Sequence, residues 1–100
     1  MADVVFLASG EKDAQEAYQH CFELDPVLAE RFSRAIDLVV RELGRFPESG
    51  VQVGGRFRRK LVPWFRNYGV FYVFEGLRVV IQAVQDLRQD PEMIQRRLSK

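Results

Sequence analysis

The sequence predicts an α+β fold in which an antiparallel helical hairpin covers one face of a small, mainly antiparallel sheet. Two observations carry this prediction. An apolar period of three and four residues runs through residues 11–44, and from residue 56 onward β-branched and aromatic segments separated by turn formers replace it. The chain has 100 residues, 47% of them apolar, which suits one compact core. We therefore expect a single domain over residues 1–100.

A short strand over residues 4–8 is the first predicted element, because five apolar residues precede Ser9. We expect this strand to be buried on both of its faces. A first helix is expected from about residue 11 to residue 24, where apolar side chains recur at helical spacing. Asp13 and Glu16 have the spacing of a capping box at its start.

A second helix is predicted to begin at Asp25-Pro26, because aspartate accepts hydrogen bonds from free helix N–H groups and proline at the first position loses no needed donor. Its apolar stripe runs from Leu28 to Leu43, and Gly44 offers a left-handed stop. The short turn between the two helices predicts an antiparallel hairpin.

After the loop "GRFPESG", three strands are predicted to form an antiparallel meander. The first of them carries Phe57, Leu61 and Val62 among cations, and the others cover residues 68–75 and 77–86 with a tight turn between them. The sheet face away from the hairpin is then left to solvent or to a partner. A short carboxyl-terminal helix follows, and it offers three side chains for burial: Met93, Ile94 and Leu98.

Composition and motifs exclude several classes of function. Fifteen basic and fourteen acidic residues give a net charge of +1, which excludes a globally basic nucleic-acid binder. Cys21 is the single cysteine, so a reducing cytoplasm fits and an internal disulfide is excluded. The amino-terminal apolar run is too short for a signal peptide or a membrane span. We expect no cofactor, metal or membrane partner, because no nucleotide, zinc or calcium motif occurs, and we interpret His20 as a surface residue.

The segment "RFRRKLVPWFRNY", residues 56–68, contains five cations and four aromatic residues. Strand alternation places Arg56, Arg58 and Lys60 on one face. This face is either a solvated strand surface that discourages edge pairing or an anion-binding patch beside stacking aromatics. Alternation fails at Arg59, which points either into the core or outward through a bulge. The residues that we expect to bind a partner or target are Arg56, Arg58, Lys60, Trp64, Arg66, Tyr68, Arg78 and Arg88.

The order of these elements resembles the RelE/ParE superfamily of bacterial toxins, which belong to two-component toxin–antitoxin systems. The resemblance spans residues 4–98 and is carried by the "FPESG" loop, the basic strand, "WFRNYGVFYVFEG", and "VVIQAVQDLRQDP" running into a tail helix. It implies a growth-inhibiting toxin held inactive by a cognate antitoxin, with higher-order hetero-oligomers of the two proteins. Family antitoxins wrap an extended or helical segment around the toxin, adding to the sheet edge and filling a groove against the hairpin.

Two branches of the superfamily imply different activities. RelE-like members cleave messenger RNA on the ribosome, and ParE-like members poison DNA gyrase without nuclease residues. The cations of a nuclease site would be Arg58, Lys60, Arg66 and Arg88.

The carboxyl-terminal tail favours the ParE-like branch. It has Met93 or Ile94 where the nuclease pattern places a tyrosine, and "LRQDPE" resembles the "RRDPE" ending of ParE-like members. We therefore expect a non-catalytic inhibitor of DNA gyrase with no catalytic residue. The alternatives are a ribosome-dependent endoribonuclease and an inactive relative that retains only antitoxin binding.

Overall fold

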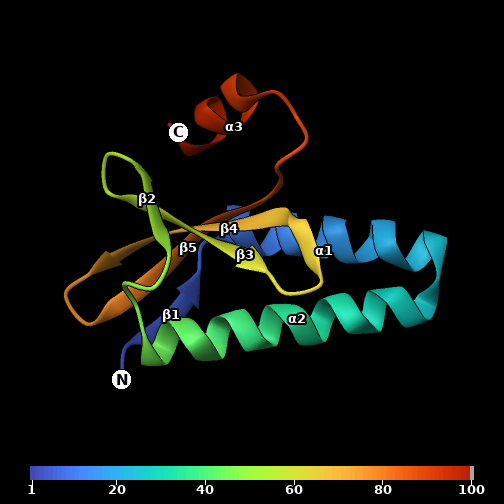
Figure 1. Ribbon diagram of the computed structural model, residues 1–100, viewed down its shortest axis with the longest axis horizontal. Helices are drawn as coiled ribbons and strands as arrows, with labels where there is room; N and C mark the ends of the chain where they lie inside the picture. The colour runs from blue at the N-terminus through green and yellow to red at the C-terminus, as the bar shows by residue number, and fades with distance from the viewer. Residues whose placement is uncertain (100) are drawn as a thin grey trace.

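The computed structural model describes residues 1–99, which form three helices and a five-stranded sheet (Figure 1). Within these residues, no helix combines the length and the apolar character needed to cross a membrane. The elements in chain order are β1 (Asp3–Phe6), α1 (Ala8–Leu24), α2 (Pro26–Arg45), β2 (Val51–Gly54), β3 (Phe57–Val62), β4 (Phe65–Glu75), β5 (Arg78–Asp86) and α3 (Pro91–Leu98).

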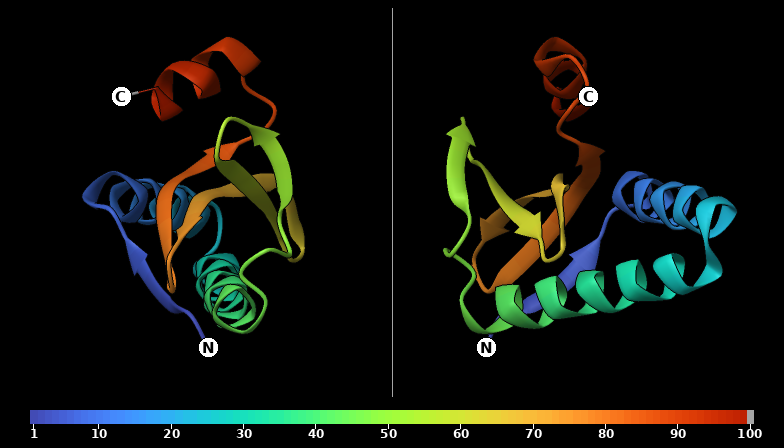
Figure 2. Two further views of the ribbon diagram at one scale, coloured as in Figure 1. Left: turned by 90° about the vertical axis from the view of Figure 1, so that its left-hand side faces the viewer. Right: turned by 45° about the vertical axis from the view of Figure 1, so that its right-hand side comes forward.

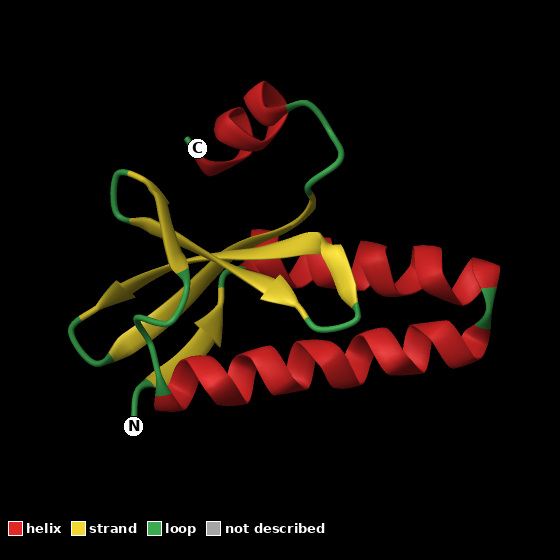
Figure 3. Cartoon of the chain, in the orientation of Figure 1, coloured by secondary structure: helices red, strands yellow, loops and turns green. Residues whose placement is uncertain are grey.

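The sheet has the strand order β1-β5-β4-β3-β2, with β1 parallel to β5 and every other pair antiparallel (Figure 3). The predicted α+β class is confirmed, but the predicted strand number was wrong. The strand that was missed, β2, pairs with β3 through a turn at Gly55 and Arg56, and Gly54 and Gly55 have φ angles of +141° and +53°. These two glycines therefore close a hairpin, because positive φ angles cost glycine little.

The helical hairpin of α1 and α2 packs on one face of the sheet, as predicted (Figure 2). Phe32 of α2 is 1% exposed and meets the rings of Phe65 and Tyr68 edge-on, with centroid distances of 5.2 and 5.4 Å. Asp25 caps α2 as predicted, accepting from the Val27 N–H at 2.9 Å. The predicted stop at Gly44 was wrong, since α2 continues through residue 45.

The amino-terminal elements differ from the prediction in two ways. Strand β1 ends at Phe6, and Val5 is 37% exposed, because β1 is an outer strand of the sheet and its predicted burial on both faces does not occur. Helix α1 begins at Ala8 without a side-chain cap, so the predicted capping box is absent from it. Its Asp13 bonds to β5 instead.

Helix α3 lies over the sheet face opposite the hairpin (Figure 2). Leu98 is buried there with Phe71 and Ala83, and Ile94 packs against the same cluster. The expectation that this face is open was therefore wrong over the part that α3 covers. Of the tail residues expected to be buried, Met93 is 56% exposed.

Candidate functional site

Strand β3 presents its cations on opposite faces of the sheet. Arg58 lies opposite Tyr72 and Lys60 lies opposite Val70 on β4, so both cations share the face that the hairpin covers. Alternation predicted this shared face correctly for Arg58 and Lys60, whereas Arg56, predicted on the same face, lies in the turn before β3. Alternation did not predict that α2 and the loop after it screen the side chains of Arg58 and Lys60, which are only 21% and 19% exposed.

Both cations are held by groups near the end of α2: Arg58 by the loop that follows the helix, and Lys60 by this loop and by Glu42 of the helix. Arg58 donates hydrogen bonds to the carbonyl oxygens of Glu48 and Gly50 at 3.0 and 2.9 Å, and its guanidinium lies 3.6 Å from the Glu48 carboxylate. Lys60 Nζ donates to Glu42 at 2.9 Å and to the Ser49 hydroxyl at 3.0 Å. These contacts tie β3 to the helical layer, and an incoming anion would have to compete with the two carboxylates.

Other members of the predicted set lie at the two ends of the β4–β5 ribbon. Arg56 forms an ion pair with Glu75, and Arg78 is the register partner of the same glutamate. Both arginines are exposed. Arg66 is exposed at the other end of β4, close to Trp64, which is 77% exposed.

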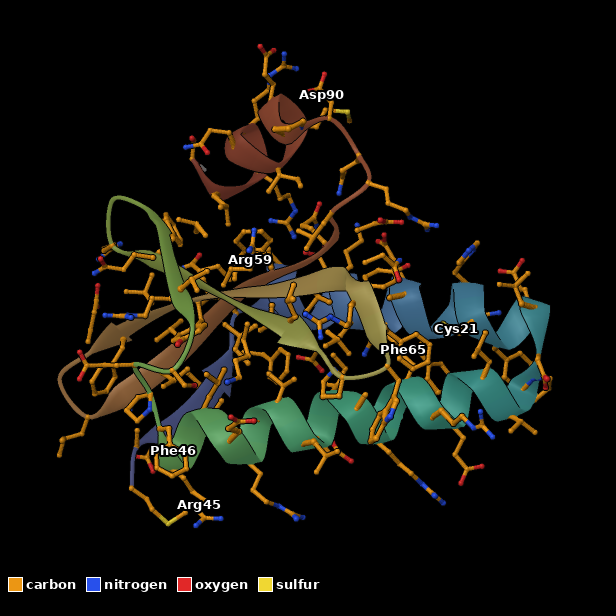
Figure 4. The ribbon with its side chains drawn as sticks, in the orientation of Figure 1. Cys21, Arg45, Phe46, Arg59, Phe65 and Asp90 are labelled. Carbon is orange, nitrogen blue, oxygen red and sulfur yellow. The ribbon has the colours of Figure 1, made fainter. Side chains whose placement is uncertain are left out.

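The structure decides which side of the sheet Arg59 faces, a question that the sequence left open. It lies opposite Phe71 on β4, on the face that α3 covers, and Figure 4 shows it on that side of the sheet. Its stem crosses Gly69, where an added Cβ would lie 3.0 Å from Arg59 Cγ and 3.1 Å from Leu87 Cδ2. Gly69 therefore makes the room that Arg59 occupies. Among residues 1–99, Arg59 Nε is a buried side-chain nitrogen that lacks a hydrogen-bond partner.

A polar cluster forms where β5 ends. Arg88 pairs with Asp86 at 2.7 Å and also bonds to it through Nε at 3.0 Å. These bonds to the Arg88 side chain lower the pKa of the Asp86 carboxyl to about 2, against the opposing effect of burial. Burial raises the pKa of Tyr68, the register partner of Asp86, and the negative charge of Asp86 raises it further. His20 of α1 lines the same hollow of about 270 Å³ as Tyr68 and Asp86.

A second polar junction joins α3 to α1 and β5. Asp13 accepts hydrogen bonds from the Val84 N–H at 3.0 Å and from Gln85 Nε2 at 2.8 Å. Its other carboxylate oxygen accepts from Arg97 at 2.8 Å, and Arg97 also donates to the Ser9 carbonyl at 2.9 Å. The Asp13 side chain is 9% exposed. This junction holds α3 in place over the sheet.

Three of the four cations of the nuclease alternative form ion pairs within the chain. Arg58, Lys60 and Arg88 each pair with a different carboxylate, and Arg66 is exposed on β4. Over the described part of the chain, no group of three or more histidine, cysteine or acidic side chains is arranged to hold a metal ion.

No protein-family model matches this chain, and no curated protein matches it. Neither comparison identifies a family. The function proposed below is therefore argued from the geometry of the site.

Several residues of the site gave little signal in the sequence. Asp13 was assigned to a helix cap, and Arg97 appeared only as one of several charged tail residues. The partners of the basic strand, Glu42 and Glu48, lie 18 and 10 positions away from the cations that they bind. The glycine opposite Leu61, Gly69, was the one local hint that a long side chain crosses β4.

Proposed function

We propose that this chain is the toxin component of a toxin–antitoxin system, of the RelE/ParE kind, and that it acts by binding a target without catalysing a reaction. One observation carries the choice of binding over catalysis. Arg58, Lys60 and Arg88 each form an ion pair within the chain, with Glu48, Glu42 and Asp86 respectively. A nuclease that cleaves RNA through its 2′-hydroxyl needs cations converging on one phosphate together with a proton acceptor.

The antitoxin-binding part of the proposal is supported by the edges of the sheet. The outer strands β1 and β2 each have four residues and leave backbone groups on one side for a partner strand. Strand β2 lies beside the basic strand β3. An acidic antitoxin segment added at β2 would meet the exposed Arg56 in the turn after this strand, which favours rapid association.

DNA gyrase is the first target that we propose, and the ribosome with its messenger RNA is the alternative. The test is induction of the chain alone in a bacterial host. We expect growth arrest with filamentation and a DNA-damage response, without new transcript ends. Co-expression of an antitoxin encoded by an adjacent reading frame is expected to restore growth.

The other outcomes separate the alternatives. Cleavage of transcripts at codon-defined positions would replace the gyrase proposal with the nuclease. Normal growth at high levels of folded protein would indicate an inactive relative that keeps only its antitoxin surface. Phe32→Ala serves as the unfolded control, because loss of this buried ring is expected to cost about 3–5 kcal/mol, and it should abolish growth arrest in every case.

A further inference from the structure

A groove of about 630 Å³ lies between α2 and the turn that joins β3 to β4. Its apolar lining comes from Leu28 and Leu38 of α2 and from Phe65 at the start of β4, and Figure 4 shows Phe65 next to α2. The groove is thus a surface distinct from the ion-paired cations of β3 described above.

A row of arginines follows α2 along this groove. Arg31, Arg34 and Arg41 all line it, because spacings of three and seven residues return side chains to one side of a helix. Within residues 1–99, Arg31 and Arg41 have no ion-pair partner. Arg34 is paired with Glu30, but both side chains are largely exposed, and such a pair is weak and easily exchanged. The row spans about 15 Å along the helix, so it offers its charges to more than one anionic group.

Trp64 presents an aromatic ring at one side of the same groove. It is the second residue of the two-residue turn between Val62 and Phe65, and its indole is 77% exposed. Phe65 offers less surface, because it is partly buried and its ring meets Phe32 edge-on at a centroid distance of 5.2 Å. The groove therefore combines an accessible aromatic ring with a row of guanidinium groups.

We propose that this groove binds a single-stranded segment of nucleic acid, with one base stacked on Trp64 and neighbouring phosphates bound by the arginines of α2. Surfaces that bind single strands combine a basic groove that follows the backbone with aromatic rings on which bases stack. The planar guanidinium group donates two parallel hydrogen bonds to a phosphate, which suits arginine to this role. The inference concerns binding alone and implies no cleavage. It goes beyond the proposed function and does not depend on it.

Asp37 is the acidic residue in this lining. It lies between Arg34 and Arg41 in the chain, and its side chain is exposed. Its carboxylate repels phosphates, so we expect Asp37→Asn to tighten binding of a single strand by about twofold or more at low salt.

The test is a titration of the intact chain with a fluorescein-labelled octamer of deoxythymidylate, followed by fluorescence anisotropy. We expect saturable binding, and the unlabelled octamer should quench the emission of Trp64, the single tryptophan of the chain. Phosphate contacts with three arginines predict that the association constant falls about 20-fold between 50 and 200 mM salt. Deoxythymidine monophosphate, the free-nucleotide source of the same chemistry, should bind about tenfold more weakly than the octamer or worse.

Variants at Trp64 separate base stacking from apolar contact. Trp64→Phe and Trp64→Leu occupy a position whose φ is +64°, which disfavours both side chains, but only phenylalanine keeps an aromatic face. We expect Trp64→Leu to weaken binding of the octamer by about tenfold and Trp64→Phe by about threefold or less. Trp64→Gly should bind no better than Trp64→Leu, with an unchanged or higher melting temperature, because glycine adopts a positive φ readily.

Variants on α2 test the row of arginines. Arg31→Ala and Arg41→Ala should each reduce the steepness of the salt dependence by about 0.7 in the slope of the double-logarithmic plot. Arg45→Ala is the matched control, because Arg45 is exposed at the end of the same helix and lies outside the groove, over the ring of Phe46. It should leave the dissociation constant and the slope nearly unchanged.

The proposal is overturned if the octamer does not bind, if Trp64→Leu binds it as tightly as the unmodified chain, or if Arg45→Ala lowers the slope as much as Arg31→Ala. Equal or tighter binding of a blunt DNA duplex, of octaglutamate or of the mononucleotide would also overturn it. The duplex and the peptide place no base on the indole, and the mononucleotide cannot span the row of arginines. Because each readout is a dissociation constant of the isolated chain, failure here leaves the growth experiment unaffected, and the reverse also holds.

Discussion

Tyr72 joins the centre of the sheet to the loop that follows α2. Its side chain is fully buried. Its hydroxyl accepts a hydrogen bond from the Gly50 N–H at 2.9 Å and donates one to the Pro47 carbonyl at 2.7 Å. This loop also supplies the groups that hold Arg58 and Lys60, so the tyrosine supports the environment of the basic strand.

Replacing Tyr72 with phenylalanine tests this role. Tyr72→Phe leaves the Gly50 N–H and the Pro47 carbonyl without their partner, and we expect the free energy of unfolding to fall by about 1–3 kcal/mol. Urea denaturation at neutral pH measures the change. Tyr18→Phe is the control, because Tyr18 is 39% exposed; equal losses for the two variants would contradict the assigned role.

At the residue scale, the sequence predicted which neighbouring side chains share a face, but not which other residues contact them. Alternation correctly paired Arg58 with Lys60 on one face, because side chains along a strand repeat every two residues. Which face the helices cover depends on strand order, and that order is set by pairing between distant segments. The ion pairs with Glu42 and Glu48 follow from this arrangement, and no local pattern could have indicated them.

Helix α3 is held by one polar junction and a small apolar contact. The junction is the pair of Arg97 with Asp13, and the apolar contact places Leu98 beside Phe71 and Ala83. We expect Arg97→Ala to increase amide hydrogen exchange in residues 91–99 by about tenfold or more, since charge-assisted hydrogen bonds are lost. Exchange in β4 should be unchanged.

The matched control is Arg96→Ala on the same helix. Arg96 is 77% exposed and lies 3.9 Å from Glu92 within α3, so its removal should leave exchange nearly unchanged. Equal acceleration of amide hydrogen exchange by Arg96→Ala and Arg97→Ala would show that the junction with Asp13 does not stabilise α3. The intrinsic helix propensity of the segment would then explain its protection.

Among the elements, α2 was the best predicted from sequence and β2 the worst. The start of α2 at Asp25-Pro26 has a local cause, and its long apolar stripe matches its burial. Strand β2 has four residues, and it is a strand because β3 supplies its hydrogen bonds. Gly44 failed as a predicted stop because it is not among the glycines with positive φ, and its carbonyl accepts from the Ala2 N–H at 2.8 Å.

For the whole molecule, titrating groups in the core predict sensitivity to alkali. Burial raises the pKa values of Cys21, Tyr68 and Tyr72 above their ordinary values of 9.0 and 10.0. A group whose pKa is higher in the folded state than in the unfolded state contributes its full stability at pH values below its unfolded pKa. This contribution is lost as the pH rises through its folded pKa. We therefore expect the free energy of unfolding to decrease between pH 9 and pH 11.

Urea denaturation at pH 8, 9, 10 and 11 checks this expectation. Tyr68→Phe should lose less stability over the interval than the unmodified chain, whereas the exposed control Tyr18→Phe should follow the unmodified chain. A constant free energy of unfolding up to pH 11 would show that these side chains ionise as readily in the folded state as in the unfolded state.

The parallel pairing of β1 with β5 joins segments near the two ends of the chain, from Asp3 with Arg78 to Phe6 with Ile81. Translation proceeds at about 5–20 residues per second, so roughly 4 to 15 s separate the synthesis of the two strands. During this interval β1 has no partner strand, and α1 lacks the strand to which its Asp13 bonds. Formation of the complete sheet therefore waits for the synthesis of β5, and a chain interrupted before β5 leaves β1 unpaired.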